Sequence, residues 1–80
     1  PFLFVADKTK VLRVDLRQKR ADLFAPANAF PSPPVFLNDL AADPESGMLY
    51  VSDCGDFQGK GAAVYRITPQ GLVSLVADGK

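Results

Sequence analysis

The 80-residue sequence suffices for one small domain, which buries about 60% of the surface that its unfolded chain exposes. Its 48% hydrophobic and 22% charged residues, with a mean hydropathy of +0.05, exclude an intrinsically disordered chain. Zero net charge argues against a nucleic-acid partner, and no apolar run approaches the ~20 residues of a membrane span. We therefore expect no nucleic-acid or membrane partner and a soluble protein of the cytoplasm or the periplasm.

The first 25 residues predict three short strands joined by polar turns, at residues 2–7, 11–16 and 21–25. In the middle strand Leu12, Val14 and Leu16 alternate with charged residues, which is the period of two of a half-buried strand. We therefore predict that these three side chains form the apolar face of that strand.

A loop follows at residues 26–35, because its four prolines exclude both a helix and a central strand. Residues 36–42 and 48–53 then predict a β-hairpin, for which Asp43, Pro44 and Gly47 supply turn chemistry. A loop with three glycines leads to two further strands, at residues 63–68 and 72–77. No window has a helical period, so the predicted fold class is all-β.

The sequence repeats with a period of about 50 residues. FLFVAD (2–7) parallels MLYVSD (48–53), VLRV (11–14) parallels VYRI (64–67), and DLFA (22–25) parallels SLVA (74–77). Three strands followed by four, with such a repeat, are typical of four-stranded β-propeller blades. We predict strands B, C and D of one blade at 1–26, a proline-rich rim loop at 27–37, and a complete following blade at 38–80.

About one and three-quarter blades cannot close a propeller, which needs roughly 4 to 8 of them. A single repeat cannot bury its faces without neighbours. We therefore expect the remaining blades as partners, either from a longer protein of which this chain is a segment or from other copies that assemble into a ring.

Asn38 and Asp39 form a polar pair at the start of an apolar strand, where no turn needs both. The loops 26–37 and 54–62 are expected to emerge on the same rim, with Asn38 just inside the mouth. An amide oxygen is a hard neutral ligand that suits calcium or magnesium. Alternatively, the two side chains cap the strand by bonding the backbone.

The motifs LNDLAADPESGMLYVSD (37–53) and AAVYRITPQGLVSLVADG (62–79) resemble a blade of the senescence marker protein, gluconolactonase and luciferin-regenerating enzyme family, and of the related paraoxonases. The resemblance implies a six-bladed propeller with a divalent cation in its channel, calcium first and zinc, magnesium or manganese as alternatives. It places Asn38 as a metal ligand or against the substrate, with Asp39 as the usual second member of the pair. Phe36 departs from the arginine that some sugar lactonases carry there.

The function that this resemblance implies is metal-dependent hydrolysis of a small-molecule lactone or ester, completed by acidic ligands from other blades. The alternatives are a non-catalytic propeller used as a binding platform and a strictosidine-synthase-like enzyme. Asp53, where a strand enters the glycine loop, either orients a water or substrate or caps the turn. The lone Cys54 excludes an internal disulfide, and without a histidine as base it is not expected to be a nucleophile.

Overall fold

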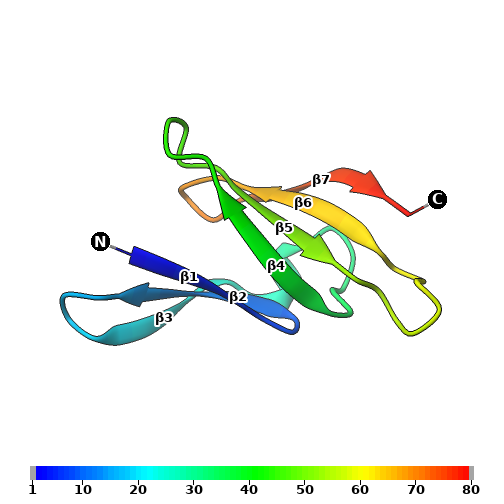
Figure 1. Cartoon of the computed structure of the whole chain (residues 1–80), viewed down its shortest axis with the longest axis horizontal. Coiled ribbons are helices and arrows are strands. Elements are labelled where there is room, and N and C mark those ends of the chain that lie inside the picture. Colours follow the sequence, from blue (N-terminus) through cyan, green and yellow to red (C-terminus); the bar gives the residue numbers. More distant parts are fainter. Residues whose placement is uncertain (1, 80) are drawn as a thin grey trace.

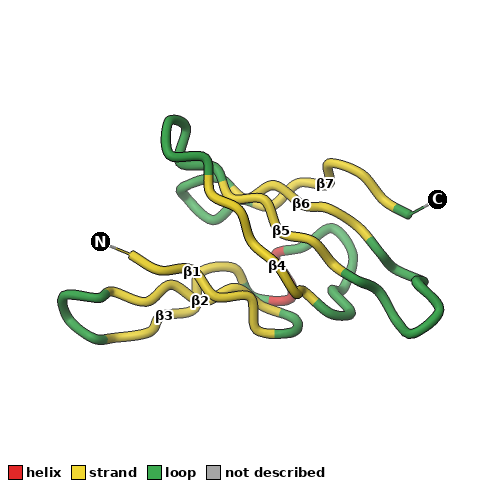
Figure 2. Tube along the Cα trace, in the orientation of Figure 1, coloured by secondary structure: helices red, strands yellow, loops and turns green. Residues whose placement is uncertain are grey.

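Seven strands in two antiparallel sheets account for about half of residues 2–79, the part of the chain that the computed structural model describes (Figures 1 and 2). The first sheet has the order β1-β2-β3, with β1 at Phe2–Asp7, β2 at Lys10–Asp15 and β3 at Arg20–Ala25. The second has the order β4-β5-β6-β7, with strands at Leu37–Ala42, Leu49–Asp53, Ala63–Ile67 and Val73–Asp78. The predicted all-β class is confirmed. The predicted segments 1–26 and 38–80 each extend one residue beyond the described range.

The predicted turn of the β4–β5 hairpin forms as its residue types require. Gly47 takes φ +76°, a left-handed conformation that glycine adopts without steric cost, and its N–H donates to the Asp43 carbonyl at 2.8 Å. The Asp43 carboxylate accepts hydrogen bonds from the Ser46 hydroxyl at 2.9 Å and from the Glu45 N–H at 3.0 Å. These bonds, that of Ser46 first, lower the pKa of Asp43.

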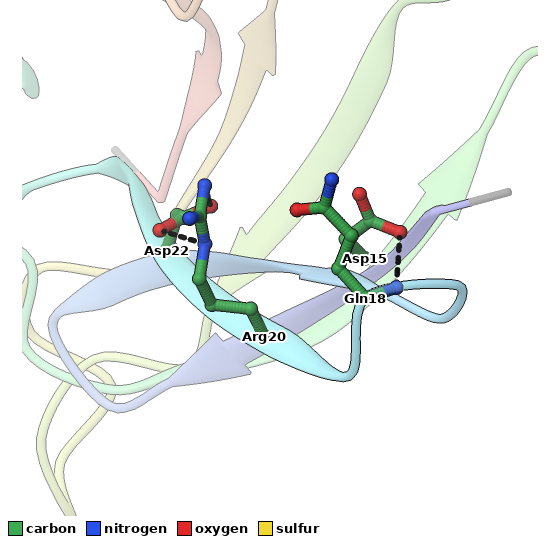
Figure 3. Close-up of polar contacts among 4 residues, drawn as sticks. All are labelled: Asp15, Gln18, Arg20 and Asp22. Carbon is green, nitrogen blue, oxygen red and sulfur yellow. Dashed lines mark hydrogen bonds and ion pairs between the residues drawn. The ribbon is translucent and has the colours of Figure 1, made fainter.

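The β2–β3 turn is stabilised in the same way (Figure 3). The Asp15 carboxylate accepts hydrogen bonds from the N–H groups of Arg17 and Gln18, at 2.9 and 3.1 Å. Beyond the turn, the guanidinium of Arg20 pairs with the carboxylate of Asp22 at 3.4 Å. Both partners of this ion pair are solvent-exposed, so it contributes little to stability.

One prediction about the proline-rich segment was wrong, because it contains a single turn of 3-10 helix, η1, at Ala27–Ala29. The N–H groups of Ala29 and Phe30 donate to the carbonyls of Pro26 and Ala27, at 2.9 and 3.3 Å. Pro26 precedes the turn and donates no bond within it, so the missing proline N–H costs nothing there. No helix within residues 2–79 is long and apolar enough to cross a membrane.

Residues that are equivalent in the sequence repeat pair with equivalent partners in the two sheets. In the first sheet Val5 lies opposite Leu12 and Leu3 opposite Val14; the repeat-equivalent pairs in the second are Val51 with Tyr65 and Leu49 with Ile67. Both sheets are also interrupted by a β-bulge at the same place. Its extra, unpaired residue is Phe24 in β3 and the equivalent Val76 in β7. The sequence repeat is therefore also a repeat of strand pairing.

The core lies between the two sheets, which pack face to face. From the first sheet it takes Val11 and Ala25, with Phe4, Ala6 and Phe24 packed against them. From the second sheet and its loops it takes Leu37, Leu49, Val51, Tyr65 and Ile67, joined by Phe30. The rings of Phe30 and Tyr65 meet edge to face with centroids 5.0 Å apart.

The apolar face predicted for β2 is present, but it is not the face that the core buries. Val11 is fully buried, whereas Leu12 and Val14 lie on the opposite side of the sheet and Leu16 is 51% exposed. The alternation of residues along β2 was real, but Val11 lies beside Ala6 and Ala25 on the side that the second sheet covers. Contact between sheets, and not the pattern within one strand, selected the buried face.

The sheets are joined by a backbone bond at the start of β4. Leu37 is 1% exposed, and its N–H donates to the carbonyl of Lys8 in the β1–β2 turn at 2.6 Å. This bond brings the edge strand β4 against β1, as Figure 1 shows. The first sheet therefore lies against the second sheet at the end where β4 begins.

Tyr65 predicts an alkaline dependence of stability. Burial, followed by the nearby carboxylates of Asp53 and Asp78, raises the pKa of Tyr65 from 10.0. A tyrosine whose pKa is raised by folding makes its full contribution to the free energy of unfolding below the unfolded pKa of about 10. That contribution is lost as the pH rises through the folded-state pKa. The free energy of unfolding, measured in urea from about pH 8 to pH 11, should therefore fall in the wild type.

In Tyr65→Phe this fall should be smaller, because the ionisable hydroxyl is gone. Tyr50→Phe is the matched control, since it removes a hydroxyl from a side chain that is 37% exposed. An identical alkaline profile for Tyr65→Phe and the wild type would contradict this assignment.

Candidate functional site

Asn38 is the extra residue of a β-bulge near the start of β4. Leu37 pairs with Asp53 and Asp39 with Ser52, which leaves Asn38 without a partner in the ladder. Its side chain is exposed, and the amide oxygen accepts a hydrogen bond from the Ser52 hydroxyl at 3.0 Å. Bulges re-aim a side chain out of the regular alternation. Asn38 is thus exposed on an edge strand, and a hydrogen bond from Ser52 of the neighbouring strand orients its amide group.

The amide oxygen of Asn38 has two lone pairs, of which the bond from Ser52 uses one. The other is free to accept from a ligand or to coordinate a hard cation. Sequence reasoning missed Ser52 as the group that orients this amide. Its position opposite Asp39 could have been found by counting the hairpin register outward from the turn at Gly47.

Asp39 lies beside Asn38 and is also exposed. One of its carboxylate oxygens accepts a hydrogen bond from the next N–H in the chain, that of Leu40, at 2.9 Å. This is the local backbone bond that the capping alternative describes. The structure therefore brings Asp39 and Asn38 together on the same exposed stretch of β4.

Asp53 lies at the other side of this hairpin end and is only 3% exposed. Its carboxylate accepts three backbone hydrogen bonds, from the N–H groups of Val35 and Phe36 at 2.8 and 2.9 Å and from that of Gly55 at 2.8 Å. The buried charge is thus compensated by directed donors. Asp53 holds the end of the proline-rich loop to the beginning of the glycine loop, which is the arrangement that its turn-capping alternative describes.

The loops 26–36 and 54–62 meet where β4 begins and β5 ends. Besides the bonds to Asp53, the Cys54 N–H donates to the Phe36 carbonyl at 2.9 Å. Within the glycine loop, Asp56 accepts from the N–H groups of Gln58 and Lys60, both at 2.9 Å. Both loops therefore have defined conformations at the same end of the second sheet, where β4 begins.

A hollow of about 310 Å³ lies at this end of the molecule, bounded by Ser32 of the proline-rich loop, the glycine loop, Tyr65 and the end of β7. Asn38, Asp39 and Asp53 are not among the residues that line it. The structure thus places the candidate residues on the exposed side of β4 and at the loop junction, apart from this hollow.

Within residues 2–79 no group of three or more histidine, cysteine, aspartate or glutamate side chains could hold a metal ion. Asn38 fits a cation as one oxygen ligand among several, because it has a free lone pair, an exposed position and an orienting partner.

Comparison of the chain with protein-family models, with curated proteins and with solved structures found no match. The family resemblance of residues 37–53 and 62–79 stays a prediction.

Proposed function

We propose that this chain supplies three strands of one β-propeller blade and the whole of the next blade. Three observations support the proposal: the common register of the two sheets, the bulge at the same place in both, and the packing of one sheet face on the other. On this arrangement β4 is the innermost strand of the second blade and faces a central channel. The two adjoining loops form part of the rim.

The proposed activity is divalent-cation-dependent hydrolysis of a lactone or related ester. The observation that carries it is the exposed Asn38 in the bulge of β4, the strand that would face the channel. A hydrogen bond from Ser52 of β5 holds the amide of Asn38. Asn38 would hold the cation through its side-chain oxygen, and calcium suits such a ligand best. When bound, the cation supplies polarisation of the substrate carbonyl and a more acidic water.

The other residues of the site take supporting roles in this proposal. Ser52 orients the Asn38 amide, and such supporting hydrogen bonds tune metal affinity. Asp39, exposed beside Asn38, is placed to bond a substrate or a bound water. Asp53 acts at a distance, by positioning the two rim loops through their backbone N–H groups.

A binding platform without catalysis is the second candidate. It is favoured because the carboxylates of Asp39 and Asp53 already accept hydrogen bonds from backbone N–H groups. In that case Asn38 and Ser52 serve the geometry of the bulge alone.

Calcium titration of the assembled propeller separates the two candidates. Asn38→Ala removes one of ~6 to 8 oxygen ligands, so calorimetry should show a dissociation constant at least about tenfold higher. Ser52→Ala should weaken binding in the same direction, because it frees the amide to rotate. Asn38→Asp keeps the oxygen and adds a charge, so it should retain calcium binding.

Asn28→Ala is the matched control, since it makes the same chemical change at an exposed position in η1. Unchanged calcium affinity in Asn38→Ala, together with a lower melting temperature, would identify Asn38 as a structural residue of the bulge. The platform would then be the better assignment.

A further inference from the structure

The first sheet presents an apolar face that nothing in the described chain covers. Cross-strand pairing places six apolar side chains together on the side away from the core: Leu3, Val5, Leu12, Val14, Ala21 and Leu23. Leu3 is 52% exposed and Leu23 55%. A contiguous apolar face of this kind is typical of an interaction surface.

The second sheet also has an uncovered outer face, opposite the core. Pairing places Ala41 beside Tyr50, and Val64 between Ser52 and Ala77. Tyr50 and Val64 are each 37% exposed. Together with Asp39 they border a shallow depression in this face. Residues 2–79 thus present two different open faces, one on each sheet.

The contact between the two sheets indicates which kind of surface fits each open face. There, Val11 of the first sheet and Val51 of the second are both fully buried. In the repeat, Val64 is equivalent to Val11 and Val5 is equivalent to Val51. Yet Val5 and Val64 are each 37% exposed. The same two positions are buried within the chain and open at its two ends.

The equivalence extends to the rest of both faces. The open face of the first sheet corresponds to the buried face of the second: Leu3 to Leu49, Leu12 to Tyr65, and Val14 to Ile67. The outer face of the second sheet corresponds to the covering face of the first: Tyr50 to Phe4, Arg66 to Arg13, and Ala77 to Ala25. One chain therefore carries both halves of a contact that it already makes once internally.

We propose that a second copy of this chain packs head to tail on the first, with the outer face of its β4–β7 sheet on the apolar face of the β1–β3 sheet. Val64 of one copy and Val5 of the other then take the places that Val11 and Val51 hold inside each chain. The contact is heterologous, because two different faces meet, so it leaves one face open at each end and continues into a ring or a longer assembly. The proposal does not depend on a metal or an enzymatic activity.

Sedimentation velocity of the chain over a range of concentrations tests this proposal, with one arginine placed on either face. Val5→Arg and Val64→Arg are matched, since they make the same change at two equally exposed valines. Each should raise the dissociation constant at least about thirtyfold, the effect of losing an interface hot spot. Each variant alone should then sediment near 8.6 kDa, whereas the wild type associates.

An equimolar mixture of the two variants is the decisive sample. Val5→Arg keeps an intact outer face on its second sheet, and Val64→Arg keeps an intact apolar face on its first. The mixture should therefore form a heterodimer of twice the monomer mass and grow no further. Phe57→Arg is the control, because Phe57 is fully exposed in the glycine loop and lies on neither face; it should associate like the wild type.

Three results would overturn the proposal: a wild type that stays monomeric with a cooperative melt, single variants that associate like the wild type, or a mixture that remains monomeric. The first would show that no second copy covers these faces, and the last that the two different faces do not meet each other. Far-ultraviolet circular dichroism checks that each variant retains its strands. If an arginine variant loses them, Val5→Thr and Val64→Thr repeat the mixing test with a smaller change.

Discussion

Asp53→Ala should lower the free energy of unfolding by at least about 3 kcal/mol, because three backbone N–H groups lose a charged acceptor and a hydrogen bond to a charged group contributes roughly 1.5–3 kcal/mol. The N–H groups belong to Val35, Phe36 and Gly55. Their loss should also release the proline-rich loop from the glycine loop. Urea unfolding at one fixed protein concentration measures the change, because any association of the chain would shift its apparent stability.

Asp53→Asn refines this prediction. One carboxylate oxygen accepts from both Phe36 and Gly55, and the other accepts from Val35. An amide in the same orientation keeps the first two bonds and sets an NH₂ group against the third, so its cost should lie between that of alanine and zero. Asp22→Ala is the control, since its exposed ion pair with Arg20 is worth little. If Asp53→Ala cost no more than Asp22→Ala, Asp53 would not be the residue that joins the loops.

Gly55→Ala should lower the free energy of unfolding by at least about 2 kcal/mol, since the left-handed conformation alone costs an alanine about 1–2 kcal/mol. Gly55 has φ +75°, and a Cβ atom built there would lie 2.6 Å from the Lys60 carbonyl oxygen and 2.8 Å from the Ala62 nitrogen. Both contacts are with backbone, so the whole loop would have to shift and strain the bond from Gly55 to Asp53.

Gly59→Ala is the matched control for this substitution. Gly59 has nearly the same φ, +77°, but a Cβ atom there would meet nothing within 4 Å. It should therefore show the conformational cost alone, and urea unfolding of the two variants gives the contribution of close approach by difference. Equal losses in the two variants would mean that the loop yields to the added methyl group at no cost.

The strands and the hairpin could be predicted because their signals are local. Alternating and apolar runs defined every strand to within one or two residues, and Asp43 and Gly47 marked a turn whose hydrogen bonds formed as expected. The repeat could also be predicted, and the structure places its equivalent residues at equivalent register positions in the two sheets. The short 3-10 turn at Ala27–Ala29 escaped, since it needs no periodic pattern.

The candidate site was predicted only as a set of residues. The position of Asn38 in the bulge depends on how β4 pairs with β5, and the bond from Ser52 depends on the same register. The strand sequence does not reveal which residue a bulge will leave unpaired. For Asp53, both a capping and a water-orienting role were open. The backbone donors of Val35 and Phe36, 18 and 17 residues earlier in the chain, meet its carboxylate only in the folded state.

By itself, the sequence determined the all-β class, the order of the strands and their repeat, because backbone propensity and the two-residue period act over a few residues at a time. The tertiary structure alone decided which face of β2 is buried. That strand offers Val11 on one side and Leu12 and Val14 on the other, and covering by the second sheet selects Val11. It also decided which faces stay open, since burial depends on what packs against a strand as well as on the side chains that the strand carries.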